Sequence, residues 1–249
     1  MLATLKFLFV VTALGPLTGL VGIPWSLLKG NVDWMYSRAI WITAAAVRAA
    51  GIRVEAEGLE NIPAGRACIF MANHVSNLDP PVLMPLIPGR LSVLLKSELM
   101  RIPILGTAMR MAKFIPVDRS SNAAKAKASI DAASEALRGG VHILVFAEGS
   151  RSYNGKLMRF KKGPFFLARE TGAPVIPVAI SGTEKMMPPG GARIFPATAR
   201  VRFLPMIDST QFGTRDELMA AARGAINAAL PPDMQNPPLA QCAGVSQSH

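Results

Sequence analysis

A histidine and an aspartate lie close together where an apolar segment gives way to a proline-rich one. Four residues separate His74 from Asp79, and the apolar run ACIFMA at residues 67–72 comes just before them. Across a strand-to-helix turn the carboxylate can fold back onto the imidazole, fix its tautomer and stabilise the ring once it takes a proton. The alternative is structural: Asp79 caps a helix that begins at Pro80, and His74 is a turn residue. Taken alone, the pair favours the structural interpretation.

A second polar segment, FAEGSRS at residues 146–152, also follows an apolar run. Gly149 permits a tight turn with exposed backbone N–H groups, and Arg151 presents a planar fork that matches a phosphate. Glu148 can orient that arginine or hold a substrate hydroxyl. The structural alternative is a turn closed by an ion pair between Glu148 and Arg151.

Two further segments have the pattern of strands. IPVDR at residues 115–119 places Arg119 at a strand end, and VIPVAI at residues 175–180 has the composition of a core strand. The sequence contains no phosphate-binding glycine-rich loop, no GxSxG nucleophile elbow and no Cys–His pair. Its three histidines and two cysteines indicate neither a zinc site nor a disulfide framework.

The elements that must position these segments alternate between strands and helices. The predicted strands are residues 52–57, 67–72, 91–95, 114–117, 142–146, 175–180 and 200–204, the last of them exposed or at an edge. The predicted helices are residues 80–86, 99–111 with a break at Pro103, 122–137, 163–170 and 214–230, where Thr214 and Glu217 have capping-box spacing. Because several strands are apolar throughout, we expect an α/β sheet covered on both faces.

The N-terminal residues 7–28 carry no charge, and about 20 residues suffice to cross the core of a bilayer. Pro16 and Pro24 are expected to bend such a helix, so a kinked span and an anchor in one leaflet both stay open. A cleaved signal peptide is the weaker alternative. A second helix is predicted over residues 31–50. The cluster Trp25, Trp34 and Trp41 indicates the headgroup level of a membrane, or else the core of an ordinary helical hairpin.

The composition sets the class of partner. There are 27 Lys and Arg against 16 Asp and Glu, a net charge of +11, and hydrophobic residues make up 50% of the chain. A fully disordered chain is excluded, and acidic partners are predicted: nucleic acid, anionic lipid or phosphorylated small molecules. A nucleic-acid binder is disfavoured because the tryptophans lie in the apolar N-terminus rather than among the basic runs. We expect membrane-anchoring helices at 1–50, a catalytic domain at 51–230 and a disordered tail at 231–249.

The segments NHVSNLD, KFIPVDR, FAEGSRS and VIPVAI, in this order, resemble the four sequence blocks of the glycerolipid acyltransferase family, in particular its bacterial 1-acyl-sn-glycerol-3-phosphate acyltransferases. Ser150 stands where the family usually has threonine, which keeps the hydroxyl. The resemblance covers about residues 50–210, and Lys96 and the FKKGPF stretch also look familial. It implies a mixed, largely parallel sheet covered by helices, with the N-terminal apolar helices as a membrane anchor.

The resemblance also implies a reaction. His74, held by Asp79, would act as general base on the free sn-2 hydroxyl of lysophosphatidic acid, and the acyl group would come from acyl-CoA or acyl-carrier-protein. The product would be phosphatidic acid, with no cofactor and no metal. The phosphate of the acceptor would be bound by Arg119, Arg151 and Lys96. No residue is an obvious covalent nucleophile, so a ternary complex is favoured over an acyl-enzyme.

The remaining candidate substrate-binding residues are Asn73, Glu148, Gly149 and Ser150. The expected partners are the two substrates and an anionic membrane surface, with the catalytic domain on the cytoplasmic face of a bacterial inner membrane and no role for nucleic acid. Two alternatives stay open: acylation of another lysolipid, such as a lyso-ornithine lipid, and a non-catalytic, basic, membrane-tethered binding module. The second predicts that the histidine and aspartate of the first block are dispensable.

Overall fold

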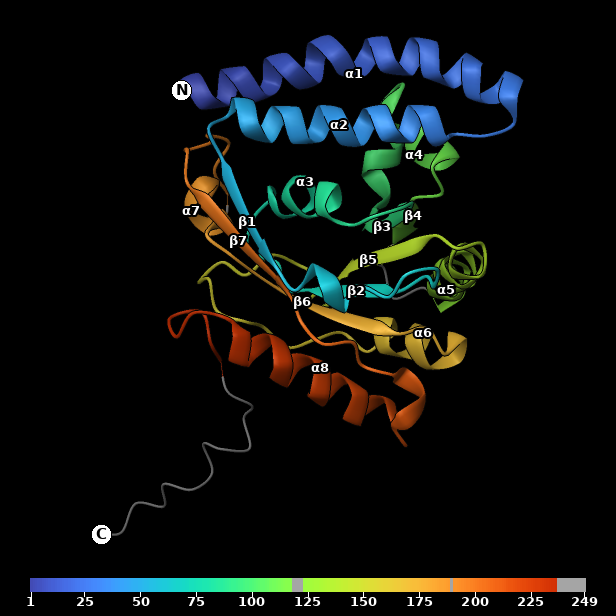
Figure 1. Ribbon diagram of the computed structural model, residues 1–249, viewed down its shortest axis with the longest axis vertical. Coiled ribbons are helices and arrows are strands. Elements are labelled where there is room, and N and C mark those ends of the chain that lie inside the picture. Colours follow the sequence, from blue (N-terminus) through green and yellow to red (C-terminus); the bar gives the residue numbers. More distant parts are fainter. Residues whose placement is uncertain (118–122, 189, 237–249) are drawn as a thin grey trace.

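The computed structural model describes residues 1–117, 123–188 and 190–236, which form a central sheet with helices on both faces (Figure 1). The strands are β1 (Arg53–Glu57), β2 (Ile69–Ala72), β3 (Leu91–Lys96), β4 (Ile115–Val117), β5 (His142–Phe146), β6 (Val175–Ser181) and β7 (Thr198–Phe203). Their order in the seven-stranded sheet is β1-β7-β6-β2-β5-β3-β4. All neighbours are parallel except β6 and β7, so the predicted mixed, largely parallel sheet is confirmed.

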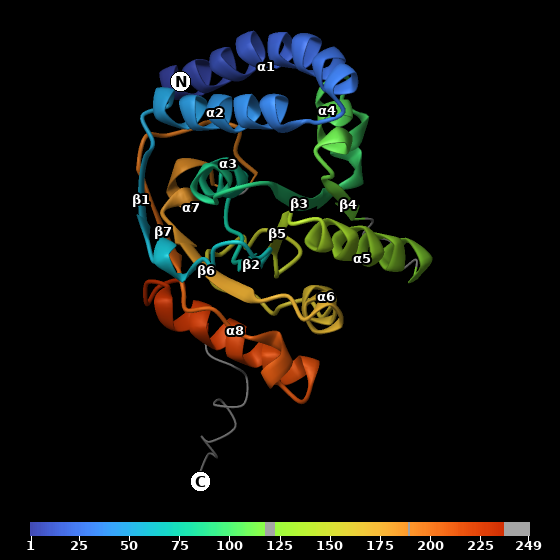
Figure 2. The same ribbon diagram turned by 45° about the vertical axis from the view of Figure 1, so that its right-hand side comes forward.

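Alternate side chains of the central strands enter two separate cores. Along β2, Ile69 and Met71 belong to one core and Phe70 and Ala72 to the other, and all four are fully buried. One face is covered by α5 (Ala123–Arg138), α6 (Gly163–Thr171) and α8 (Arg215–Ala229). The other is covered by α3 (Asp79–Leu83) and α2 (Asp33–Ala49), with α1 (Leu2–Lys29) outside them (Figure 2). Burial on both faces explains why these strands are apolar throughout.

The N-terminal pair of helices forms the outermost layer. In α1, Pro16 and Pro24 lie inside one continuous helix, which arches over α2 (Figure 1). Within the described residues, α1 is the one helix long and apolar enough to cross a membrane, by length and composition. The predicted second helix is confirmed as α2.

Three features differ from the sequence expectations. β7 is exposed at alternate residues, as one of the two expectations has it, but it is not an edge strand, because β1 pairs with it in parallel and takes the edge. A short helix, α7 (Thr183–Met186), follows β6 and was not expected. Residues 231–236, placed in the predicted tail, contact the domain: Met234 is buried and its carbonyl accepts the Leu157 N–H at 2.9 Å. The rest of that predicted tail lies outside the described residues.

The turn from β6 into α7 depends on a glycine. Gly182 has φ +89°, and a Cβ there would collide with the Thr198 carbonyl oxygen of β7. Gly155 also has a positive φ, +76°, but faces open space. We expect Gly155→Ala to lower the free energy of unfolding by about 1–2 kcal/mol, the cost of the left-handed conformation alone, and Gly182→Ala to lower it by more. Urea unfolding of both variants measures the difference. Equal losses would contradict the close approach of β6 and β7 at this turn.

Candidate active site

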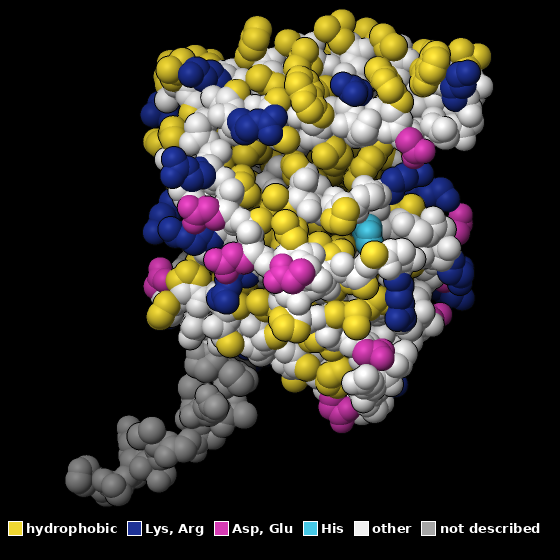
Figure 3. All heavy atoms as spheres, viewed as in Figure 1, with side chains coloured by type: hydrophobic (Ala, Val, Ile, Leu, Met, Phe, Trp, Pro, Cys, Tyr) yellow, Lys and Arg dark blue, Asp and Glu magenta, His cyan; other side chains and the backbone are white. Residues whose placement is uncertain are grey.

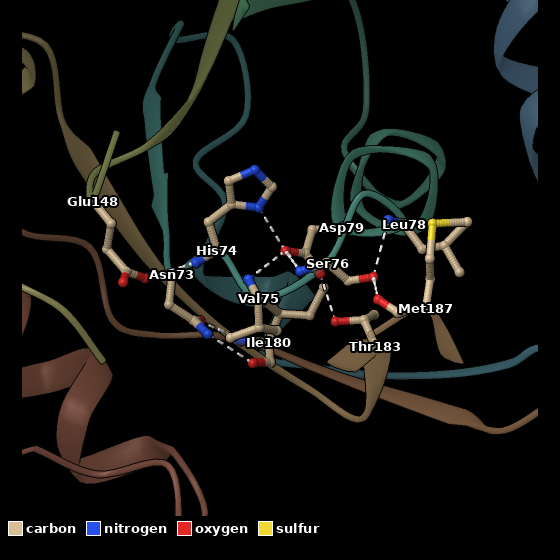
Figure 4. Close-up of polar contacts among 10 residues, drawn as sticks. All are labelled: Asn73, His74, Val75, Ser76, Leu78, Asp79, Glu148, Ile180, Thr183 and Met187. Carbon is tan, nitrogen blue, oxygen red and sulfur yellow. Dashed lines mark hydrogen bonds and ion pairs between the residues drawn. The ribbon is translucent and has the colours of Figure 1, made fainter. Parts of the chain in front are cut away.

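Three loops meet at the carboxyl ends of the adjacent strands β6, β2 and β5. His74 lies just after β2, Glu148 just after β5 and Thr183 just after β6 (Figure 4). These strands are parallel, so their following loops lie at one edge of the sheet, where α/β folds bind ligands.

The centre of this site is the carboxylate of Asp79, which is fully buried. Its Oδ2 accepts the backbone N–H groups of Val75 at 2.8 Å and Ser76 at 2.9 Å, and lies 2.7 Å from Nδ1 of His74. Its Oδ1 accepts the Thr183 hydroxyl at 2.5 Å. Both oxygens are therefore surrounded by donors, which is the condition for keeping a carboxylate charged away from water.

These contacts bear on the helix-cap interpretation of Asp79. The helix α3 begins at Asp79 itself, and its N-cap, Leu78, makes no side-chain capping bond. The carboxylate turns back to the N–H groups of residues that precede the helix, instead of accepting those of its first turn. Asp79 thus holds the turn before α3 and the imidazole of His74.

The imidazole of His74 is fixed on several sides. Its ring stacks on Phe146 with centroids 4.1 Å apart, and its side chain is 16% exposed. The backbone carbonyl accepts the Ser152 N–H at 2.8 Å. Because a carboxylate can only accept, the bond to Asp79 assigns a proton to Nδ1, and in the neutral ring Nε2 then carries none. Such a ring can take a proton from a bound hydroxyl at Nε2.

Glu148 holds backbone on both sides of the site. Its Oε1 accepts the His74 N–H at 2.7 Å and its Oε2 the Met158 N–H at 2.9 Å. Burial raises the pKa of Glu148 to about 7, although both hydrogen bonds act in the opposite direction. No ion pair joins Glu148 to Arg151 in the part of the chain that the structure describes, so the structural alternative of a turn closed by that pair does not hold.

Asn73 ties the end of β2 to β6. Its side-chain nitrogen donates to the Ile180 carbonyl at 2.9 Å and its side-chain oxygen accepts the Ile180 N–H at 2.8 Å. The side chain is buried, and both of its polar atoms are bonded to backbone. The contacts of Asn73 therefore position the neighbouring loop, and its expected contact with substrate stays a prediction.

The structure describes only some of the candidate phosphate-binding residues. Gly149 makes the predicted tight turn with φ +74°, and Ser150 is exposed. Arg151 is half-buried, and its Nη1 has no hydrogen-bond partner among the described residues. Arg151 is the neighbour of Ser152, which bonds to the loop after β2. Arg119 lies outside the described residues, as does the side chain of Lys96 at the end of β3.

Sequence reasoning missed two hydroxyl residues of the site. Thr183 donates to the buried carboxylate, and Ser76 donates to the Met187 carbonyl at 3.0 Å while accepting the Leu78 N–H at 3.3 Å. A signal for Thr183 was present, since Gly-Thr follows a buried strand at the same strand-end position as the other two loops. Among the described residues no group of three or more His, Cys, Asp or Glu side chains could hold a metal ion.

Comparison with known proteins identifies the family of this domain. A family model described as Acyltransferase matches residues 53–181. A 1-acyl-sn-glycerol-3-phosphate acyltransferase of Pseudomonas aeruginosa is 34% identical over 177 residues, covering 71% of this chain and 66% of that protein. The alpha form of Homo sapiens is 31% identical over 172 residues, covering 69% and 60%. The matched region thus spans less than two thirds of either relative.

A solved structure extends the likeness to nearly the whole chain. The crystal structure of a 1-acyl-sn-glycerophosphate (LPA) acyltransferase, PlsC, from Thermotoga maritima superimposes with a TM-score of 0.78. It is 25% identical, and the match covers 99% of this chain and 97% of that one. The N-terminal helices are therefore included in the shared fold.

The raised pKa of Glu148 predicts a pH dependence of stability. A carboxyl whose pKa is 4.5 unfolded and about 7 folded stabilises the protein below pH 4.5 and loses that contribution as pH rises through 7. The loss is at most about 3 kcal/mol. Relative to Glu148→Gln, the wild type should lose free energy of unfolding between pH 5 and 8. Urea titrations measure this, with the exposed Glu170→Gln as control. Parallel pH profiles for wild type and Glu148→Gln would contradict the burial of this carboxyl.

Proposed function

This chain belongs to the acyltransferase family, and from that membership we propose that it acylates the free sn-2 hydroxyl of 1-acyl-sn-glycerol-3-phosphate. The donor is acyl-CoA or acyl-carrier-protein and the product is phosphatidic acid. The observation that carries the proposal is the 2.7 Å contact between Nδ1 of His74 and the buried Asp79 carboxylate at the carboxyl end of a central strand. The names of the matched relatives, which specify this acceptor, support the choice of lysolipid.

The chemistry follows from the free ring nitrogen. Nε2 of His74 removes the proton of the acceptor hydroxyl while the hydroxyl oxygen forms a bond to the thioester carbonyl carbon. The buried Asp79 carboxylate stabilises the imidazolium produced. Collapse of the tetrahedral intermediate breaks the carbon–sulfur bond, and the leaving thiolate takes its proton from the imidazolium. The reaction is balanced without a metal or a cofactor.

Binding of the acceptor phosphate is assigned to Arg151, Arg119 and Lys96. Arg151 follows the strand next to the one that presents His74, and its Nη1 is a buried atom without a hydrogen-bond partner among the described residues, which a charge-assisted bond to phosphate would satisfy. Gly149 and Ser150 form the turn that carries it. In this arrangement the loop after β5 binds the phosphate, and the neighbouring loop after β2, which carries His74, contacts the reacting hydroxyl.

The N-terminal residues 1–50 are proposed as the membrane anchor of a catalytic domain at residues 51–230, on the cytoplasmic face. The outward side chains of α1 support this: Leu5, Leu8, Phe9, Leu17, Leu20, Val21, Leu27 and Leu28 are exposed large hydrophobics. Figure 3 shows hydrophobic side chains along α1 and α2, with Lys and Arg among them. Such a surface suits an anionic leaflet that also holds the lipid substrate.

The proposed base and its partner should behave as one unit. We expect His74→Ala to lower kcat by about 10²–10⁴-fold, the usual contribution of a positioned general base. Asp79→Asn should lose a large share of the activity, because the proton at Nδ1 loses its charged acceptor. The double variant should be little worse than His74→Ala, since residues that act together are not additive. Steady-state turnover with lysophosphatidic acid measures all three.

Thermal unfolding of the same proteins separates catalysis from folding. His74 is partly exposed at the loop surface, so His74→Ala should keep a cooperative transition. A folded His74→Ala protein with full activity would refute the mechanism. Unchanged activity in Asp79→Asn would instead show that Asp79 has only a structural role.

The phosphate assignment predicts that lysine cannot replace arginine. A bidentate fork becomes a point charge in Arg151→Lys, so KM for lysophosphatidic acid should rise about tenfold or more, with a smaller change for the thioester. Arg169→Lys on α6 is the matched control and should match the wild type. Kinetics with a monoacylglycerol acceptor complete the test. If Arg151→Lys loses as much activity with this phosphate-free substrate, Arg151 has only a structural role.

Anchoring by apolar surface predicts resistance to salt. At about 1 M salt the Debye length is about 3 Å, so attachment by charge alone is released. We expect the full chain to stay with the membrane pellet after such a wash and to leave it only in detergent. Quantitative release by salt would show that the basic surface, not α1, holds the protein.

A further inference from the structure

A compact hairpin follows β3 and leads to α4 (Leu105–Met111) through a 3-10 turn at Ser97–Arg101. Its outer side chains are apolar and exposed: Leu99 at 40%, Ile102 at 43% and Leu105 at 43%. Single exposed apolar residues are ordinary on protein surfaces, but three on one short turn form a patch. We refer to residues 97–111 as the α4 hairpin.

The α4 hairpin is held together without burying these side chains. The Gly106 N–H donates to the Ile102 carbonyl at 2.7 Å, and a Cβ on Gly106 would collide with the backbone carbonyl of Met100. The Arg110 guanidinium donates to the Met100 carbonyl at 2.8 Å and to the Thr107 hydroxyl at 3.0 Å. Backbone contacts and the Arg110 side chain therefore fix the turn, while the side chains of Leu99, Ile102 and Leu105 stay exposed.

The α4 hairpin packs against α1, and Ile104 makes a close contact there. Ile104 has φ +63°, a backbone conformation that β-branched residues rarely adopt. Its side chain occupies the space beside Gly19, where a Cβ would collide with it. Packing against α1 thus offsets the unusual backbone of Ile104, and Figures 1 and 2 both show the α4 segment next to α1.

Exposed apolar side chains of α1 also lie within one turn of the hairpin's contact. Leu17, Leu20 and Val21, in the same turns as the glycine that the hairpin contacts, are 61%, 62% and 60% exposed. Arg101, at the tip of the hairpin, is exposed and suits anionic headgroups. Proximity to the exposed apolar residues of α1, the proposed anchor, and this basic residue favour a lipid surface over a second copy of the chain.

We propose that the α4 hairpin is a second membrane-contacting element, with Leu99, Ile102 and Leu105 at the boundary between headgroups and acyl chains. The inference rests on the proposed membrane association of α1. A contact beside the α1–α2 pair adds a further point of attachment, which limits rotation of the domain about the α1 axis. Because the hairpin directly follows β3, it fixes how the carboxyl ends of the strands, and so the candidate active site, face the bilayer.

Site-specific fluorescence quenching tests the proposal in the full chain. Cys242→Ser removes one thiol, and Cys68 is fully buried, so a single introduced cysteine carries the label. Labels replace Leu105, Leu20 in α1, and Leu59, a control on the domain that is 42% exposed. The labelled proteins are reconstituted in vesicles of phosphatidylethanolamine and phosphatidylglycerol. Quenchers are a nitroxide-bearing lipid and aqueous iodide.

We expect the labels at Leu105 and Leu20 to be quenched by the lipid nitroxide at least about threefold more strongly than the label at Leu59, as an interfacial depth requires. Lipid quenching at Leu20 with iodide quenching at Leu105 would overturn the hairpin contact and leave the α1 anchor standing. Iodide quenching at both would overturn the anchor as well. Protection of Leu105 from both quenchers would indicate a protein contact, such as a second copy, and would also refute the proposal.

Discussion

A carboxylate buried away from water must be surrounded by hydrogen-bond donors, and this requirement at Asp79 shapes the candidate site. Removing one partner of a buried charge typically lowers the free energy of unfolding by about 3–5 kcal/mol, so each donor to Asp79 is needed for stability. Two of them are the N–H groups of Val75 and Ser76, which fixes the turn before α3. The others are the imidazole of His74 and the hydroxyl of Thr183, which connects this turn to the end of β6. The position of the imidazole is therefore set by the folding of the sheet.

Two neighbouring side chains extend the same principle. Glu148 accepts backbone N–H groups from the loops after β2 and β5, and Asn73 bonds to the backbone of β6. The polar residues around the imidazole are thus engaged with backbone, whereas Nε2 of His74 has no such contact assigned to it. This arrangement supports the proposal that Nε2 of His74 is the reactive atom and that its neighbours hold the ring in place, as expected where rigid elements position a reactive group.

The sequence predicted most of the elements and one contact of the site, and the exceptions share a physical cause. The strands were readable because burial on both faces makes them apolar, and the contact between His74 and Asp79 is local to one turn. Thr183 lies 104 residues from the carboxylate that it contacts, so its part depends on strand order, which hydrophobic periodicity does not encode. The same limit applies to β7, whose alternating pattern shows one covered face but not which strand pairs beyond it. The roles of Arg119 and Lys96 stay predictions.

The assignment of the proton on His74 can be measured directly by nitrogen NMR of protein labelled in its imidazole rings. The bond to Asp79 predicts that the neutral ring carries its hydrogen on Nδ1 and none on Nε2. His142 is an internal reference with the opposite tautomer, since its Nδ1 accepts the Cys68 N–H at 3.0 Å and its hydrogen must lie on Nε2. Two buried or half-buried rings with opposite tautomers at neutral pH would agree with the mechanism. A His74 ring that carries its hydrogen on Nε2 would have no free base to offer the acceptor hydroxyl and would contradict it.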